Sequence, residues 1–121
     1  MRVELTRTFH FSAAHRLPAA GETHPCRNLH GHNFSVEVTV AGVPDPRTGW
    51  VIDYGRIRDA AAPLIESLDH HLLNEIPGLE NPTSENLARW LWERLRPHLP
   101  GLERIGISET PGTLCSYWGE E

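Results

Sequence analysis

The most informative stretch of the sequence is Cys26-Arg27-Asn28-Leu29-His30-Gly31-His32, which runs directly into Asn33-Phe34-Ser35-Val36-Glu37-Val38-Thr39-Val40. From His30 onward the even positions hold two histidines and then apolar residues, and the odd positions hold small or polar residues. This alternation predicts a strand over residues 32–41 whose even face points into a core. Both imidazoles continue that face. Alternate residues of a strand lie about 7 Å apart, so the two rings can reach one metal ion or can simply be satisfied histidines at a strand end.

A second alternating stretch lies at the start of the chain and predicts a strand over residues 2–14. Arg7 is the one polar exception on its odd face, and His15 continues that face. If the two strands pair antiparallel, the end of the first meets the start of the second, and His15, His30 and His32 converge. Three neutral imidazoles with an open fourth position are typical of a catalytic zinc ion. The apolar residues of the odd face are Val3, Leu5, Phe9, Phe11 and Ala13.

The rest of the chain completes an α+β pattern in the order ββααββ. A turn at residues 43–49 precedes a short strand, Trp50–Ile52, and Asp53 is a plausible helix N-cap. The apolar spacing predicts a helix ending at Leu68, with Pro63 inside it as a source of a kink or a shifted start. Thr83 is expected to cap a second helix. Strands are then expected over about 103–109 and over 113–118. The helical stripes consist of Ile57, Ala60, Ala61, Leu64 and Leu68, and of Leu87, Trp90, Leu91 and Leu95.

Length and composition restrict the class of protein. A chain of 121 residues with 39% hydrophobic residues is enough for one domain over residues 1–121. The net charge of −5 and the lack of a basic block argue against nucleic acid as a ligand. No apolar stretch is long enough to span a membrane, and the first residues lack a signal-peptide core, so we expect a cytoplasmic protein. In the cytoplasm, the two cysteines Cys26 and Cys115 do not make a disulfide framework.

Several short motifs occur in order along nearly the whole chain, and together they resemble the 6-pyruvoyltetrahydropterin synthase superfamily. More narrowly, the chain resembles the branch that forms 6-carboxy-5,6,7,8-tetrahydropterin in the synthesis of queuosine and other 7-deazapurines. The motifs are Phe11-Ser12-Ala13-Ala14-His15-Arg16-Leu17, Cys26 with His30-Gly31-His32, Gly49-Trp50-Val51-Ile52-Asp53-Tyr54, Leu68-Asp69-His70-His71-Leu72-Leu73-Asn74, Pro82-Thr83-Ser84-Glu85-Asn86 and Glu109-Thr110.

The resemblance implies a T-fold, an antiparallel sheet with two helices on one face. It also implies trimers whose sheets close a barrel, stacked as a homohexamer, with active sites between subunits. The implied enzyme is a carbon–carbon lyase that binds Zn²⁺ through His15, His30 and His32. Its substrate would be 7,8-dihydroneopterin triphosphate, and its products would be 6-carboxy-5,6,7,8-tetrahydropterin, acetaldehyde and triphosphate.

Cys26, His70 and Asp69 are the residues expected to move protons. From the residues alone, Cys26 could be a fourth zinc ligand, and the choice between His70 and His71 is open. The resemblance implies that Cys26 is a proton acceptor beside the metal, that His70 shares in proton transfer, and that Asp69 orients His70. A thiol near a metal ion and an imidazolium has a lowered pKa, which suits this role.

Glu109 extends the apolar strand face of Ile105 and Ile107, where a carboxylate is costly unless it is paired. A salt bridge to an arginine is one explanation. The resemblance implies instead that Glu109 binds the N–H edge of the pterin ring and takes part in the proton relay, with Thr110 adding a hydroxyl contact. Glu85 fits a role in the first turn of a helix.

Two arginines, Arg16 and Arg27, flank the histidine and cysteine motifs and are either triphosphate contacts or ordinary surface residues. Two other functions remain open. The first is the sister activity, 6-pyruvoyltetrahydropterin synthesis, in which the gap between the cysteine and the His-Gly-His motif is usually wider than the three residues found here. The second is a non-catalytic module that is stabilised by a closed zinc site and binds a protein.

Overall fold

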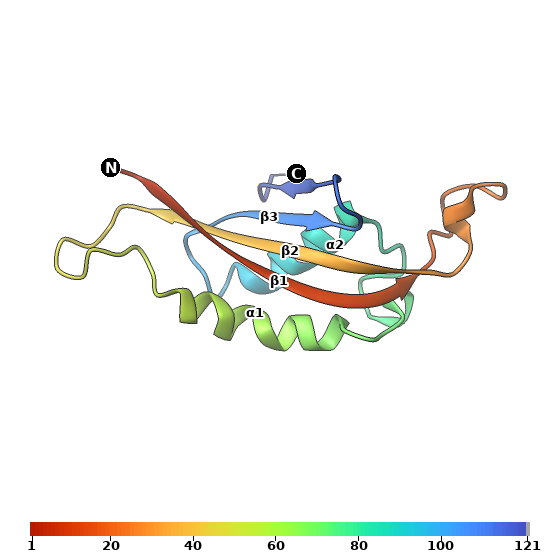
Figure 1. The fold of residues 1–121 in the computed structure, drawn as a ribbon, viewed down its shortest axis with the longest axis horizontal. Coiled ribbons are helices and arrows are strands. Elements are labelled where there is room, and N and C mark those ends of the chain that lie inside the picture. Colours follow the sequence, from red (N-terminus) through yellow and green to blue (C-terminus); the bar gives the residue numbers. More distant parts are fainter. Residues whose placement is uncertain (121) are drawn as a thin grey trace.

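The computed structural model describes residues 1–120, so residue 121 of the expected domain lies outside the described part. A four-stranded antiparallel sheet in the order β1-β2-β3-β4 carries both helices on one face (Figure 1). This arrangement confirms the predicted α+β class. The elements are β1 (Val3–His15), β2 (His30–Gly42), α1 (Tyr54–Leu68), α2 (Ser84–Leu95), β3 (Leu102–Ser108) and β4 (Cys115–Tyr117), with short 3-10 helices at Pro25–Arg27 and Leu73–Glu75.

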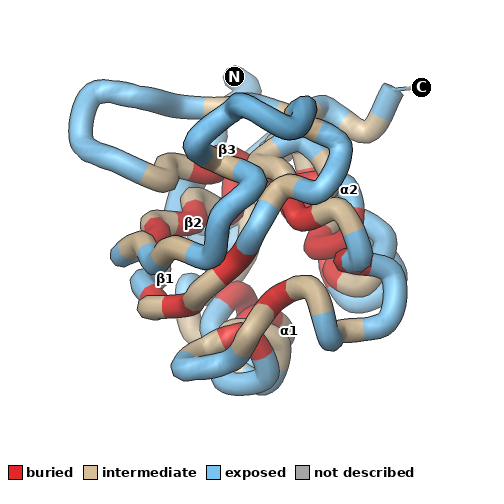
Figure 2. The backbone as a smooth tube through the Cα atoms, turned by 90° about the vertical axis from the view of Figure 1, so that its right-hand side faces the viewer, coloured by how far each residue is buried: buried red, intermediate tan, exposed pale blue. Residues whose placement is uncertain are grey.

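The register of β1 and β2 confirms the predicted antiparallel pairing. Val3 lies opposite Gly42 at one end of the pair, and His15 lies opposite His30 at the other. Because side chains alternate across a strand, the face that carries Phe11, His15 and Phe34 points toward the helices. Figure 2 shows buried residues gathered between the sheet and the helices, which is where the alternation predicted the core.

Both helices begin where their capping residues predict. Asp53 accepts a hydrogen bond from the N–H of Gly55 at 2.8 Å, and Thr83 accepts one from the N–H of Asn86 at 3.1 Å. Helix α1 runs through Pro63 without ending, and Pro63 lies on its exposed side, where the carbonyl that Pro63 leaves unpaired can reach solvent. Helix α1 packs on β1 and α2 packs on β3.

The structure corrects the predicted elements at a few places. Trp50–Ile52 is not a strand, because the Trp50 carbonyl accepts from the Asp45 N–H at 3.0 Å to close the turn, and Val51 and Ile52 pack against the core without a strand partner. The first strand has the predicted length but is shifted by one residue, so that it includes His15, and the second strand is longer than predicted and begins at His30. The last strand is shorter and covers only Cys115–Tyr117.

Candidate active site

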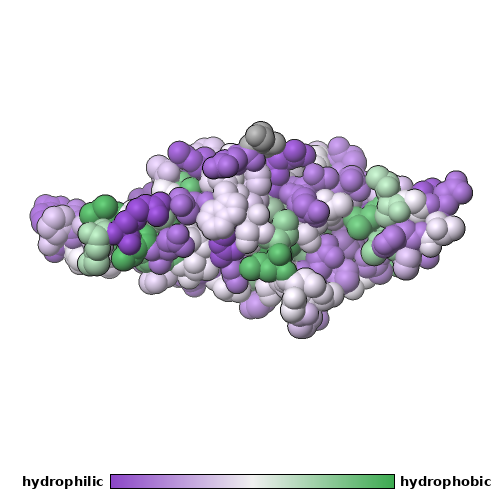
Figure 3. Space-filling view, turned by 90° about the horizontal axis from the view of Figure 1, so that it is seen from above, coloured by the Kyte–Doolittle hydropathy of each residue, from purple (hydrophilic) through white to green (hydrophobic). Residues whose placement is uncertain are grey.

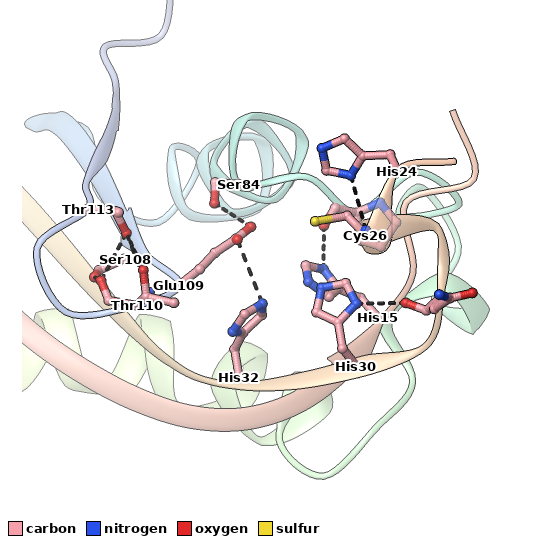
Figure 4. Close-up of polar contacts among 12 residues, drawn as sticks. His15, His24, Cys26, His30, His32, Ser84, Ser108, Glu109, Thr110 and Thr113 are labelled. Atoms are coloured by element: carbon pink, nitrogen blue, oxygen red, sulfur yellow. Dashed lines mark hydrogen bonds and ion pairs between the residues drawn. The ribbon is translucent and has the colours of Figure 1, made fainter. Parts of the chain in front are cut away.

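Three histidines meet where β1 ends and β2 begins. One ligand atom from each of His15, His30 and His32 lies within 4.8 Å of the corresponding atoms of the other two. The ring centroids of His15 and His30 are 4.6 Å apart, and those of His30 and His32 are 5.0 Å apart. Figure 4 shows the three rings facing one region of space. The strand register produces this convergence, because His15 pairs with His30 and Ala13 pairs with His32.

Hydrogen bonds to backbone carbonyls leave two of these rings ready to bind a metal ion. Nδ1 of His15 lies 2.9 Å from the Pro82 carbonyl oxygen, and Nδ1 of His30 lies 2.7 Å from that of Asn28. A carbonyl only accepts, so each Nδ1 carries the proton and each Nε2 keeps a lone pair. Nε2 of His15 is buried and has no hydrogen-bond partner among the described residues. This donor set fits a divalent metal ion.

The protonation state of His15 agrees with this role. Burial lowers the pKa of the His15 imidazole, and the neighbouring rings of His30 and His32 act in the same direction. The Pro82 carbonyl and Glu109 oppose the shift, but burial is the largest cause. A neutral imidazole is the form that binds a metal ion, so the fold holds His15 in its ligand form at neutral pH.

Glu109 lies one residue beyond β3 and next to the histidine cluster. One carboxylate oxygen accepts a hydrogen bond from the Ser84 hydroxyl at 2.7 Å, and the other lies 3.9 Å from Nε2 of His32 (Figure 4). The carboxylate borders a cavity of about 390 Å³. The cavity is lined by Ser84, Glu85, Ile107, Glu109, Thr110, Thr113, Leu114 and Cys115. Among residues 1–120 the contacts of Glu109 are with Ser84 and His32, so the structure does not support the alternative of a salt bridge to an arginine.

The neighbouring residues of this cavity differ in what they offer a ligand. The Thr110 hydroxyl lies 3.1 Å from that of Thr113, and the Thr110 carbonyl accepts from Ser108 and Thr113. Glu85 is exposed on the first turn of α2 and its side chain borders the same cavity. Burial raises the pKa of the Cys115 thiol, and Glu85 and Glu109 raise it further. The thiol is therefore protonated at neutral pH.

Cys26 lies in the 3-10 helix Pro25–Arg27, at the end of the loop that joins β1 to β2. Its backbone N–H donates to Nδ1 of His24 at 3.1 Å, and its carbonyl accepts from the N–H of Leu17 at 2.8 Å. Figure 4 shows the sulfur directed toward the space beside His15 and His30. In the described part of the chain, the group of possible metal ligands contains the three histidines and does not include Cys26.

Asp69 and His70 are tied to the edge of the sheet at Ser12. One Asp69 carboxylate oxygen accepts from the Ser12 N–H at 2.9 Å, and the other lies 3.0 Å from Nδ1 of His70. The Ser12 N–H is the largest cause of a lowered Asp69 pKa, followed by the His70 side chain. The backbone N–H of His70 donates to the Ser12 carbonyl at 2.6 Å. These contacts hold His70 at a φ of 59°, a conformation that residues other than glycine rarely adopt.

The side chain of His70 is 80% exposed, and it borders a cavity of about 530 Å³ on the sheet. Ser12, Gly31, His32 and Asn33 also line this cavity, and along the strands Ser12 and Asn33 alternate with the residues that point to the histidine cluster. Within the described residues no contact joins Asp69 or His70 to Cys26. The structure thus brings the three histidines and Glu109 together in one chain, but it does not bring His70 to Cys26.

His71 is the alternative to His70 for the role in proton transfer, and it contacts the backbone at the end of α1 and in β1. Its Nδ1 lies 2.7 Å from the Asp69 carbonyl oxygen, and its own carbonyl accepts from the Ala14 N–H at 3.1 Å. His71 therefore helps attach this segment to β1, whereas His70 is the histidine that pairs with the Asp69 carboxylate among the described residues.

Two contacts of the site were not predicted from the sequence. Ser84 directly follows Thr83, the predicted helix cap, yet its hydroxyl binds Glu109. The Pro82 carbonyl orients His15 across 67 positions of sequence. The only sequence signal for Ser84 is its place in the first turn of a helix beside a strand end, and a backbone carbonyl leaves no signal at all.

A family model agrees with this geometry. The model described as 6-pyruvoyl tetrahydropterin synthase matches residues 4–120, which is nearly the whole chain. The chain belongs to this family. Its relatives include a 6-carboxy-5,6,7,8-tetrahydropterin synthase of Synechocystis sp., which is 37% identical over 118 residues covering 93% of this chain and 90% of the relative. A dihydroneopterin monophosphate aldolase of Pyrococcus furiosus is also 37% identical, over 90% of this chain and 91% of its own.

Solved structures of the 6-pyruvoyl tetrahydropterin synthase family share the fold. The 6-pyruvoyl tetrahydropterin synthase of Caenorhabditis elegans superposes with a TM-score of 0.90 at 29% identity, covering 99% of this chain and 97% of that one. The expected T-fold and the expected pterin lyase of this family are thereby confirmed. None of the helices in the described part of the chain has the length and apolar character that a bilayer span requires.

Proposed function

We propose that this chain converts 7,8-dihydroneopterin triphosphate and water into 6-carboxy-5,6,7,8-tetrahydropterin, acetaldehyde and triphosphate. It does so as a single T-fold domain over residues 1–121, and as a cytoplasmic enzyme of queuosine or other 7-deazapurine synthesis. The observation that carries the proposal is the adjacency of the Glu109 cavity and the three-histidine cluster, with 3.9 Å between Glu109 and His32. A carboxylate in the wall of a cavity suits the paired N–H groups of a pterin edge, because each of its two oxygens can accept a hydrogen bond. The short gap between Cys26 and His30 supports the carboxy-forming reaction over its sister activity.

His15, His30 and His32 would hold the metal ion, which we propose to be Zn²⁺. A bound zinc ion polarises the oxygens of the substrate side chain and makes the adjacent carbon more acidic. The histidines serve this chemistry because their Nδ1 protons are fixed on backbone carbonyls and their remaining nitrogens converge.

Glu109 holds the pterin ring so that its side chain lies against the histidine cluster, and Ser84 fixes the carboxylate that does so. Cys26 accepts a proton from the side chain of the substrate. His70 returns protons to that side chain, and Asp69 orients the imidazole ring of His70. Because one chain does not bring His70 to Cys26, we propose that the two act across a subunit boundary. The assembly is proposed to be a hexamer made of two trimers.

A second candidate is 6-pyruvoyl tetrahydropterin synthesis, in which triphosphate is eliminated and the three-carbon side chain is kept. The close superposition on the Caenorhabditis elegans enzyme of that name supports this second candidate. A non-catalytic zinc module is less well supported, because it would need neither the Glu109 cavity nor an open ligand position.

The test is incubation of the zinc-loaded protein with 7,8-dihydroneopterin triphosphate, with product masses and released acetaldehyde as readouts. We expect the mass of 6-carboxy-5,6,7,8-tetrahydropterin and one acetaldehyde per turnover. A product that retains all three side-chain carbons would identify the sister activity. No turnover by protein that binds the pterin would favour the binding module. His15→Ala, His30→Ala and His32→Ala should each remove most of the zinc, because three ligands leave no redundancy.

A further inference from the structure

The groups of the site lie in a definite order along the protein. Figure 4 shows Glu109 on one side of His32, and His15, His30 and Cys26 grouped together on its other side. The proposed substrate has its groups in a matching order, which is a pterin ring, then a three-carbon side chain, then phosphates at the end of that chain. If the ring lies on Glu109 and the side chain lies against the histidines, the phosphates emerge on the side of Cys26.

A basic cavity lies on that side of the site. It has a volume of about 400 Å³ and is lined by Arg16, Pro18, Arg27, Asn74 and Glu80. Arg16 follows His15 in the sequence, and Arg27 follows Cys26. The N–H of Leu17 donates to the Cys26 carbonyl at 2.8 Å, so the two ends of the loop that carry these arginines are held side by side.

The backbone of Arg16 is clamped from a third segment. The Asn74 side chain accepts from the Arg16 N–H at 2.9 Å and donates to the Arg16 carbonyl at 2.8 Å. This double contact fixes where the Arg16 side chain leaves the main chain. Arg27 is fixed by its own side chain, because one guanidinium nitrogen donates to the Pro18 carbonyl at 3.1 Å.

The two arginines of this cavity have their positive charges available for an anion. Within residues 1–120 no carboxylate forms an ion pair with Arg16 or Arg27. The one acid in the wall, Glu80, has an oxygen committed to the N–H of Gly78 at 2.7 Å. The chain as a whole carries a net charge of −5, so a triphosphate needs a local concentration of positive charge in order to bind. Arginine presents several N–H donors in a fork that suits phosphate oxygens.

We propose that Arg16 and Arg27 form the subsite for the phosphate groups of the substrate. This inference rests on the proposed function for the identity of the substrate. The arginines bind the phosphates while Glu109 binds the ring, so the side chain between them is stretched across the three histidines. Arg16 and Arg27 thereby distinguish a phosphorylated pterin from the same pterin without phosphate.

Calorimetry on the zinc-loaded protein tests the subsite with two probes, inorganic triphosphate and unphosphorylated 7,8-dihydroneopterin. We expect Arg16→Gln and Arg27→Gln each to raise the Kd for triphosphate by about tenfold or more, since each removes a charge-assisted contact. The Kd for 7,8-dihydroneopterin should change less than about twofold, because its contacts lie at the other end of the site. Arg47→Gln is the matched control, since Arg47 lies in the loop at the opposite end of the sheet from the loop over residues 17–28 (Figure 1).

Zinc content is measured after each titration, because triphosphate also binds free metal, and thermal melts establish that each variant is folded. The Arg16 side chain has no hydrogen-bond partner in the described part of the chain, so Arg16→Gln leaves the loop contacts intact. Equal triphosphate affinity in Arg16→Gln, Arg27→Gln and Arg47→Gln, or no binding by the unaltered protein, would overturn the subsite. The product assay is independent of this result. Arginine-dependent triphosphate binding without pterin turnover would refute the proposed function and leave the subsite standing.

Discussion

At the scale of single residues, Cys26 decides whether the proposed metal centre is open or closed. The sulfur points toward the histidines but is not one of the atoms gathered within 4.8 Å. For Cys26→Ala we therefore predict near-stoichiometric zinc, a nearly unchanged melting temperature and intact pterin binding. Turnover should fall by about 10²–10⁴-fold, the usual scale for a lost general base. Zinc content, a thermal melt and a single-turnover rate on one sample make the comparison.

The opposite pattern would contradict this assignment. If Cys26 were a fourth ligand, the same variant would lose zinc and stability together, because the binding energy of structural zinc is folding energy.

The carboxylate of Glu109 provides a second prediction at this scale. Glu109→Gln keeps the shape but replaces one acceptor oxygen by a donor group, so pterin binding should weaken by about 2–3 kcal/mol. Ser84→Ala removes the hydroxyl that holds the carboxylate and should weaken binding by less, about 1 kcal/mol. Fluorescence titration with 7,8-dihydroneopterin measures both. Unchanged binding in Glu109→Gln would make Glu109 a structural carboxylate.

At the scale of elements, the start of α2 supports two parts of the site at once. Thr83 caps the helix, Pro82 before it orients His15, and Ser84 after it binds Glu109. Thr83→Ala should lower the free energy of unfolding by about 1 kcal/mol through the lost cap. We expect zinc affinity and pterin binding to fall in the same variant, as measured by denaturant unfolding and by titration. Asp53→Ala, which removes the cap of α1, should cost similar stability and leave both affinities unchanged.

The segment after α1 depends on the Asp69 carboxylate. The pKa of Asp69 is lowered in the folded chain, chiefly by the Ser12 N–H, from an ordinary value of 3.8. The unfolded chain therefore takes up this proton first as the pH falls, so the stabilisation by Asp69 is present above that value and is lost as the pH drops through the lower folded pKa. Asp69→Asn should show a shallower loss of stability below pH 3.8 than the unaltered protein. Parallel acid limbs in pH-dependent melts would contradict this.

At the scale of the whole molecule, the surface is consistent with assembly. Strands β1 and β4 lie at the two edges of the sheet, and edge strands that stay unpaired are prone to associate. Figure 3 shows separate hydrophobic patches on a largely hydrophilic face. Large apolar side chains that are exposed in the single chain are Met1, Leu29, Val43, Trp50, Tyr54, Leu114 and Trp118.

A mixing experiment tests whether Cys26 and His70 act across a subunit boundary. Cys26→Ala and His70→Ala should each be nearly inactive. If the protein forms the proposed hexamer, assemblies refolded from an equal mixture should regain up to about one quarter of the unaltered activity, since that fraction of sites then holds both native residues. Light scattering establishes the mass of the assembly. If the mixture stays as inactive as its components, the two residues act within one chain or not together.

The amino-acid sequence by itself determined the strands that carry the site. Alternation placed His15 on the face of β1 and His30 and His32 on that of β2, because the period of a strand is a local property of the backbone. The alternation of Ile105 and Ile107 likewise predicted that Glu109 extends the apolar face of that strand. The predicted strand at Trp50–Ile52 failed because apolar character alone does not supply a pairing partner.

The tertiary structure decided how these groups are held and which of them meet. Nδ1 of His15 contacts the Pro82 carbonyl, 67 positions away, and Glu109 contacts the Ser84 hydroxyl, 25 positions away. Contacts between segments so far apart leave no periodic pattern in the sequence from which they could be predicted. The attachment of Asp69 and His70 to Ser12 likewise depends on where helix α1 ends against the edge of β1. That packing places His70 at the cavity beside Ser12 and Asn33, and among the described residues no contact joins His70 to Cys26.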